Sequence, residues 1–135
     1  MSRRVSREIA MKLIYGQLLG GSDLRSAYDD IAQENKLSIK DDEFVWSIVN
    51  GVIEHQDEMT DIIKGYSRRW TTDRLPKIDL ALLLIGVFEC GYTDNPNGAV
   101  INECVELAKN YSTTKSGAYV NGVLSSYNKS LIADK

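Results

Sequence analysis

Few side chains in this sequence have the type and spacing that catalysis requires. The single histidine, His55 in VIEHQDE, could act as a general base, but a lone histidine on a polar helix face is usually only exposed. Cys104 lies in an apolar stripe without a histidine nearby in sequence, which is typical of a small buried residue rather than a nucleophile. No glycine-rich phosphate loop follows a strand, and the acids of KDDEF lack calcium-loop spacing. The sequence therefore predicts no enzyme, no cofactor and no metal site.

Basic residues near the N-terminus indicate binding instead. On a helix, Arg3, Arg4 and Arg7 would share one face, and Lys12 would extend the strip by a turn. Guanidinium groups make forked contacts with phosphate oxygens and stack on bases. About three to five phosphate contacts would give weak, salt-sensitive binding, so a partner protein would help. A solvated helix start explains the same charges, and charge alone does not decide between the two.

The charge is distributed unevenly along the chain. The net charge is -3 and the pI about 5.2, which argues against a general nucleic-acid binder. Between Met1 and Lys12, however, four basic residues stand against one acid, whereas seven acids stand against three bases between Asp23 and Glu43. An acidic chain with a basic head suggests a local anionic partner.

The elements that must position these residues are helices. Apolar residues recur at three- and four-residue steps nearly everywhere, and no alternating strand pattern is present. We expect a first helix over about Arg3–Leu19, stopped by Gly20-Gly21, and a hinge over Ser67–Pro76. Six further apolar stripes begin near Leu24, Phe44, Met59, Ile78, Val100 and Tyr119, and the second and third of these can belong to one continuous helix. The fold class is all-α, with four helices followed by three.

Several polar residues have structural interpretations. Ser22 and Asn97 are candidate N-caps. Glu103 stands in the first turns of its helix, where a carboxylate is favourable to the dipole and can accept hydrogen bonds. Asn102 and Asn121 stand among apolar residues, so we expect them to be partly buried and bonded to neighbouring helices.

Five segments together resemble the NusB family of bacterial transcription antitermination factors. They are RRVSREIAMKLIY, DRLPKIDLALL, VFE, VINECVELAKNY and YVNGVL, and they cover nearly the whole chain from Arg3 to Leu124 in the family's order and spacing. Each motif alone is loose, but the set of five is specific. The resemblance implies a single NusB-like RNA-binding domain over residues 1–135, made of two packed helical bundles with about seven helices, roughly 1–70 and 71–135.

The resemblance also implies a function without enzymatic activity. NusB proteins pair with NusE, a ribosomal protein that doubles as a transcription factor, and bind the single-stranded boxA element of nascent ribosomal RNA. The complex then joins elongating RNA polymerase and suppresses premature termination. Some members also form homodimers. A cytoplasmic protein with reduced Cys90 and Cys104 is expected, because no signal peptide or membrane-spanning run is visible.

The family's functional residues carry over onto two sets of positions. The RNA-binding set comprises Arg3, Arg4, Arg7, Lys12, Lys115 and Tyr119. The set facing NusE comprises Tyr15, Asp73, Arg74 and Asp79. For Tyr119, a stacking surface and a core aromatic are equally good interpretations.

One helix departs from the family pattern. The family commonly has arginines at two positions where this chain has Leu80 and Leu84, so any contact made by those arginines is absent here. If either leucine were exposed, it would be a candidate for protein contact.

Two alternatives remain open at this point. A NusB-like domain precedes the catalytic domain in some ribosomal RNA methyltransferases, although no methyl-donor glycine motif is present here. The acidic pI and the short basic cluster also suit a helical protein–protein adaptor with little RNA binding.

Overall fold

The computed structural model describes residues 3–21, 23–67 and 75–133, and within these ranges the chain is all-α, without a strand. The expected fold class is therefore confirmed, but the expected number of seven helices is wrong, because the described residues form six. They are α1 (Arg3–Leu18), α2 (Leu24–Asn35), α3 (Ile39–Tyr66), α4 (Lys77–Tyr92), α5 (Asn97–Tyr111) and α6 (Thr114–Ala133).

The difference in number lies in α3. The polar run Glu54–Glu58 interrupts its apolar stripe, but it contains no proline or glycine that would end a helix. The backbone instead leaves helical geometry at His55 alone, with φ -110° and ψ 15°, and then continues to Tyr66. Two apolar stripes thus belong to one kinked helix of 28 residues.

The ends of the helices follow local chemistry. Gly20 has φ +93° and stops α1 one residue before the expected end. Asp23 caps α2 by accepting a bond from the Ser26 amide at 3.0 Å, whereas Ser22 lies outside the described residues. Asn97 is the first residue of α5 rather than its cap, and its side-chain amide donates to Asn128 Oδ1 at 2.6 Å.

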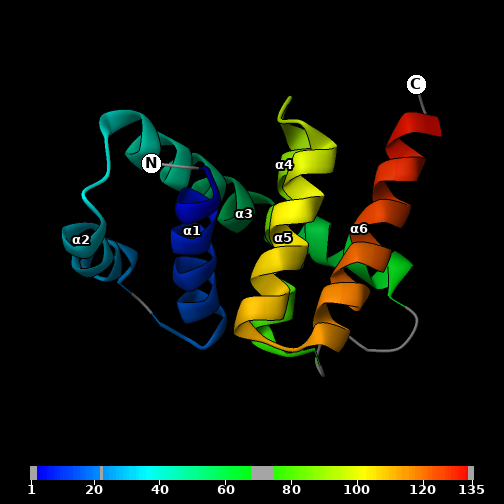
Figure 1. Cartoon of the computed structure of the whole chain (residues 1–135), viewed down its shortest axis with the longest axis horizontal. Helices are drawn as coiled ribbons and strands as arrows, with labels where there is room; N and C mark the ends of the chain where they lie inside the picture. Colours follow the sequence, from blue (N-terminus) through cyan, green and yellow to red (C-terminus); the bar gives the residue numbers. More distant parts are fainter. Residues whose placement is uncertain (1–2, 22, 68–74, 134–135) are drawn as a thin grey trace.

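Helix α4 forms the centre of the core. It packs against α1, α3, α5 and α6, and Figure 1 shows α4 and α5 between α1 and α6. Leu80 is 6% exposed and Leu84 is fully buried, so these leucines are core residues and not a contact surface. Gly86 permits close packing, because a Cβ there would lie 2.5 Å from Leu124 Cδ1. Along the described parts of the chain, no helix combines the length and apolar character needed to cross a membrane.

Candidate nucleic-acid interface

Arg7 is buried, although it was expected on the surface beside Arg3 and Arg4. Its side chain is enclosed between α1, α4 and α5, and the residue is only 4% exposed. Its Nε and Nη2 donate to the two carboxylate oxygens of Glu89, both at 2.8 Å, and Nη1 donates to Glu103. The expectation that Arg7 is displayed on the surface is therefore wrong, because the side chain is buried and its Nε, Nη1 and Nη2 already donate to carboxylates. Its assignment to the RNA-binding set stays a prediction.

The two carboxylates around Arg7 come from two of the five motif segments. Glu89 closes the segment VFE, is fully buried, and also accepts a bond from Asn95 Nδ2 at 2.9 Å. Glu103 is the acid of VINECVELAKNY and keeps about a quarter of its side chain exposed. Burial lowers the pKa of Arg7, but the bonds and charges of Glu89 and Glu103 outweigh it and raise that pKa above its ordinary value. The three residues thus form a charged network that ties α1 to α4 and α5.

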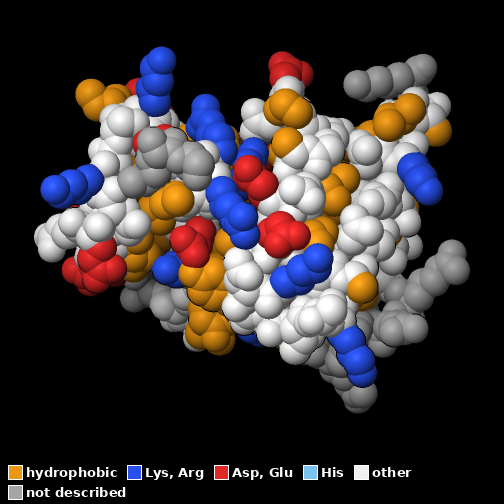
Figure 2. Space-filling model, viewed as in Figure 1, with side chains coloured by type: hydrophobic (Ala, Val, Ile, Leu, Met, Phe, Trp, Pro, Cys, Tyr) orange, Lys and Arg blue, Asp and Glu red, His pale blue; other side chains and the backbone are white. Residues whose placement is uncertain are grey.

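The other cations of α1 are on the surface. Arg3, Arg4 and Lys12 are exposed, and the Arg3 guanidinium lies 3.8 Å from the centre of the Phe44 ring. In Figure 2, Lys and Arg side chains alternate with Asp and Glu side chains on the face over α1 and α5. This face is consequently a set of separate cations and not a continuous basic patch.

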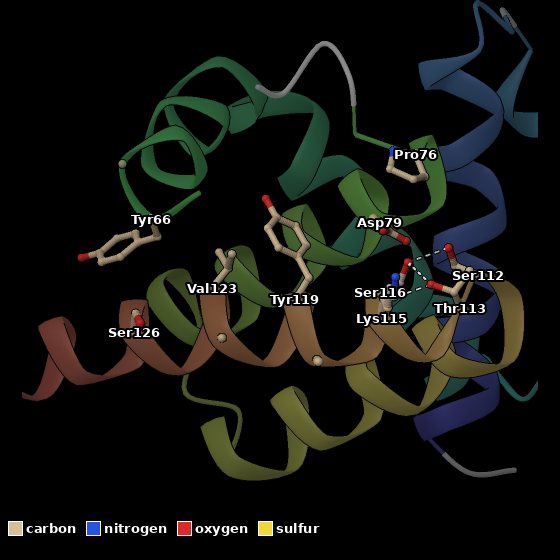
Figure 3. A pocket seen from close by; sticks show the side chains of 13 residues that line it. Tyr66, Pro76, Asp79, Ser112, Thr113, Lys115, Ser116, Tyr119, Val123 and Ser126 are labelled. Carbon is tan, nitrogen blue, oxygen red and sulfur yellow. Dashed lines mark hydrogen bonds between the residues drawn. The ribbon is translucent and has the colours of Figure 1, made fainter. Parts of the chain in front are cut away.

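A groove of about 1260 Å³ lies between the end of α3, the start of α4 and α6. Lys115 and Tyr119 line it from α6 and Asp79 from α4. Figure 3 shows Tyr119 and Val123 directed from α6 into the groove, with Asp79 beside them. The Tyr119 hydroxyl is hydrogen-bonded to Ser67 Oγ, and partial burial raises the pKa of Tyr119. The Tyr119 ring is therefore half-buried. It packs against the core, as a core aromatic would, and it also lines the groove, as a stacking surface would.

Asp79 is the most unusual polar group of the groove. It is 3% exposed, and its buried Oδ1 has no hydrogen-bond partner among the residues that the structure describes. It stands at the third position of α4, where an acid normally reaches back to the N-cap amide, but the N-cap here is Pro76, which has no N–H. The dipole of α4 favours the carboxylate, but no described residue donates to its Oδ1.

Comparison with known proteins now identifies the family. A model of the NusB family matches residues 4–129. The transcription antitermination protein NusB of Finegoldia magna is 41% identical over 127 residues, which cover 93% of each chain. That of Acetivibrio thermocellus is 40% identical over 125 residues, which cover 92% of this chain and 86% of the relative. The chain belongs to the NusB family.

Solved NusB structures share the fold. A crystal structure of antitermination factors NusB and NusE in complex with double-stranded RNA contains a chain with a TM-score of 0.85 and 27% identity, covering 95% of this chain and 96% of that one. NusB of T. maritima has a TM-score of 0.86 and 28% identity, covering 96% and 92%. Transcription antitermination factors of the NusB family are not enzymes, so the candidate site is a binding surface and not an active site.

The residues expected to face NusE are described only in part. Tyr15 is half-buried at the edge of the core, and Asp79 lines the groove. Asp73 and Arg74 lie outside the described residues. The structure thus brings Asp79, from the expected partner set, into one groove with Lys115 and Tyr119, from the expected RNA set.

The expectation that Asn102 and Asn121 are buried packing residues is wrong. Both are exposed, and Asn121 only accepts a bond from Ser125 Oγ of its own helix at 3.2 Å. The buried face of α5 follows Val100, Ile101 and Cys104, which turns position 102 to solvent. In the pair Asn102-Glu103, the acid is the residue that reaches a neighbouring helix.

One member of the charged network around Arg7 was missed in the analysis of the sequence. Glu89 is an isolated acid in an apolar helix, and such a residue calls for a buried cation, so its pairing with an arginine had a sequence signal.

The groups considered for catalysis do not assemble into a reactive site. Cys104 is buried, and burial raises the pKa of its thiol; burial likewise raises that of Cys90 to about 11. The His55 ring lies against Tyr92 in a tilted arrangement, with 4.8 Å between ring centres. Over the described ranges, no three His, Cys, Asp or Glu side chains gather in a way that could hold a metal ion.

Proposed function

We propose that this chain is a transcription antitermination factor that binds boxA-type single-stranded RNA of nascent ribosomal RNA together with ribosomal protein NusE. The complex then joins elongating RNA polymerase in the cytoplasm and suppresses premature termination. The observation that carries the proposal is the likeness to a chain of the NusB–NusE–RNA complex along 95% of this sequence. The match to NusB relatives along most of their own length supports this function over that of a methyltransferase accessory domain.

The proposed RNA contacts are those of accessible side chains. Arg3, Arg4 and Lys12 are exposed cations that we propose contact phosphates, as does Lys115 at the groove, where Tyr119 is proposed to stack on an unpaired base. Arg7 has a different proposed role, as the positioning residue that holds α1 against α4 and α5 through Glu89. RNA affinity should then depend on Arg7 only through the fold.

The proposed partner contact is at Asp79. A buried carboxylate oxygen without a partner is costly unless a donor reaches it, and a cationic side chain of NusE would supply one. Tyr15 is proposed as a second contact with NusE. Asp73 and Arg74 stay predictions from the family resemblance.

Three further points remain proposals. We propose that residues 1–135 form one domain with halves near 1–70 and 71–135, and that homodimers form in some conditions. The burial of Arg7 leaves fewer free cations, which favours the alternative of an adaptor with little RNA binding of its own.

Titration of the purified chain tests the function directly. The chain, alone and with NusE, is titrated with boxA-type single-stranded RNA, a scrambled strand and a duplex of the boxA sequence. We expect a one-to-one complex with NusE, and tighter binding of boxA RNA by the complex than by the free chain. If the complex gains nothing over the free chain, or prefers neither sequence, the cooperative antitermination role is contradicted.

A matched pair of variants locates the RNA face. Arg4→Ala should lower the slope of log affinity against log salt by about 0.7 for a lost contact to a single strand. Lys129→Ala removes another exposed cation, which lies on α6 outside the groove lining, and should leave the slope unchanged. Equal effects of the two substitutions would indicate non-specific attraction in place of a site on α1.

A further inference from the structure

Tyr111 is an aromatic side chain that the proposed RNA contacts do not include. It is the last residue of α5, and it is 40% exposed. Its hydroxyl donates to Glu8 of α1, and Lys12 Nζ lies 5.7 Å from the centre of its ring. The ring is therefore held by two residues of α1 while much of it stays open to solvent.

The position of Tyr111 links two parts of the proposed RNA surface. On one side, Lys12 belongs to the exposed cations of α1. On the other side, the next residues of the chain, Ser112 and Thr113, line the groove together with Lys115 and Tyr119. A strand that passes from the α1 cations to the groove along this connection crosses the end of α5.

The chemistry of the position suits an unpaired nucleotide. A flat ring stacks on any base, and an adjacent ammonium group can meet the phosphate of the same nucleotide. A tyrosine phenol is neutral at physiological pH and adds no negative charge beside the phosphates, and the bond to Glu8 raises the pKa of Tyr111 further, to about 12. The same bond fixes the ring before RNA arrives, which reduces the entropy lost on binding.

We propose that Tyr111 is a stacking platform for an unpaired base, between the α1 cations and the groove. The proposal rests on the proposed function, since it names a further contact of the same RNA. An RNA strand is favoured over a protein segment, because exposed cations alternate with accessible or half-buried aromatic rings along this path: Lys12, Tyr111, Lys115 and Tyr119.

The test compares substitutions that keep the ring with substitutions that remove it. Tyr111→Ala and Tyr111→Leu should weaken binding of boxA-type single-stranded RNA about five- to 150-fold, the range expected for one lost stack. Tyr111→Phe and Tyr111→Trp keep a ring and should stay within about threefold of the wild-type affinity, because base stacking does not need the hydroxyl. The Leu variant retains an apolar side chain, so it replaces the Ala variant if the latter does not fold by circular dichroism.

Two measurements separate stacking from charge. Tyr111→Leu should leave the salt slope of RNA binding unchanged and should not alter binding of inorganic polyphosphate, which has no bases. Lys12→Ala should instead lower the salt slope by about 0.7 and weaken the binding of both ligands.

The outcomes distinguish this proposal from the proposed function. If the wild-type chain with NusE binds no RNA, the proposed function fails. If it binds RNA and Arg4→Ala weakens that binding, but folded Tyr111→Leu binds as wild type, only the platform is overturned. Equal losses for RNA and polyphosphate in Tyr111→Leu would also overturn it, as would weakened capture of NusE without an effect on RNA, which would assign the ring to the protein partner.

Discussion

Replacing Arg7 by methionine should destabilise the protein strongly. Methionine keeps a long side chain in the space but removes the charge that Glu89 and Glu103 share. Water can partly solvate Glu103, but Glu89 is fully buried and would keep only the Asn95 amide. Removing one partner of a buried ion pair costs about 3–5 kcal/mol, because the other charge stays behind uncompensated. Against a typical stability of about 5–15 kcal/mol, this loss would leave the chain marginally folded.

The assay is urea unfolding of a double-mutant cycle. Arg7→Met, Glu89→Gln and the double variant are compared with wild type by circular dichroism. The double variant has no unpaired buried carboxylate at position 89, so it should be more stable than Arg7→Met alone. We expect a coupling free energy of about 1–3 kcal/mol between the two positions. A loss below about 1 kcal/mol for Arg7→Met, or no coupling, would refute the network as the anchor of α1.

The same variants decide between a structural and an RNA-binding role for Arg7. In conditions where the double variant is folded, the salt slope of RNA binding should equal that of wild type, because a guanidinium occupied by carboxylates makes no phosphate contact. A slope reduced by about 0.7, as expected for Arg4→Ala, would show that Arg7 leaves its network to meet RNA.

Three further predictions concern packing, the groove and the thiols. Gly86→Ala should lower the free energy of unfolding by about 1–3 kcal/mol, because its methyl group would lie 2.5 Å from Leu124 Cδ1. Gly122→Ala is the control in the same urea titration and should be neutral or slightly stabilising, because a methyl group there would meet no described atom within 4 Å. Asp79→Asn should stabilise the free chain by about 1 kcal/mol and weaken its one-to-one complex with NusE by calorimetry; weaker stability with unchanged binding would contradict the proposed role. Because burial raises the thiol pKa of Cys104, both buried cysteines should react with a thiol reagent only after unfolding, and rapid reaction in the native state would show that the core opens.

The helices could be predicted from the sequence because their signals are local. The apolar stripe and the Gly20 stop placed α1 within one residue of its observed end. The error in helix number arose because the polar run around His55 resembles a boundary, and whether a helix kinks or ends there depends on its neighbours. Leu80 and Leu84 could likewise not be assigned to the core from sequence, since burial around all sides of α4 requires four partner helices.

The site was less predictable because helical spacing alone does not say what covers a face. Arg3 and Arg7 do lie on one face of α1, as both guanidinium groups approach the Phe44 ring at 3.8 and 5.4 Å. Arg7, however, is one turn further along that face, where its side chain enters the space between α4 and α5 and is no longer at the surface. The shared face of Arg3 and Arg7 was therefore predicted correctly, and so was the exposure of Arg3 and Arg4, but the exposure of Arg7 was not.

The burial of Arg7 also gives a physical reason for a partner. Of the basic residues at the start of the chain, Arg3, Arg4 and Lys12 remain exposed, with Glu8 between the last two. About three phosphate contacts to a single strand give a salt slope near -2, so raising the salt from about 50 to about 200 mM would weaken binding about 20-fold. Such contacts attract RNA, but they do not hold it against physiological salt. A second protein that adds cations and base contacts beside the groove would make up the difference, and Asp79, at that groove, is the contact proposed for it.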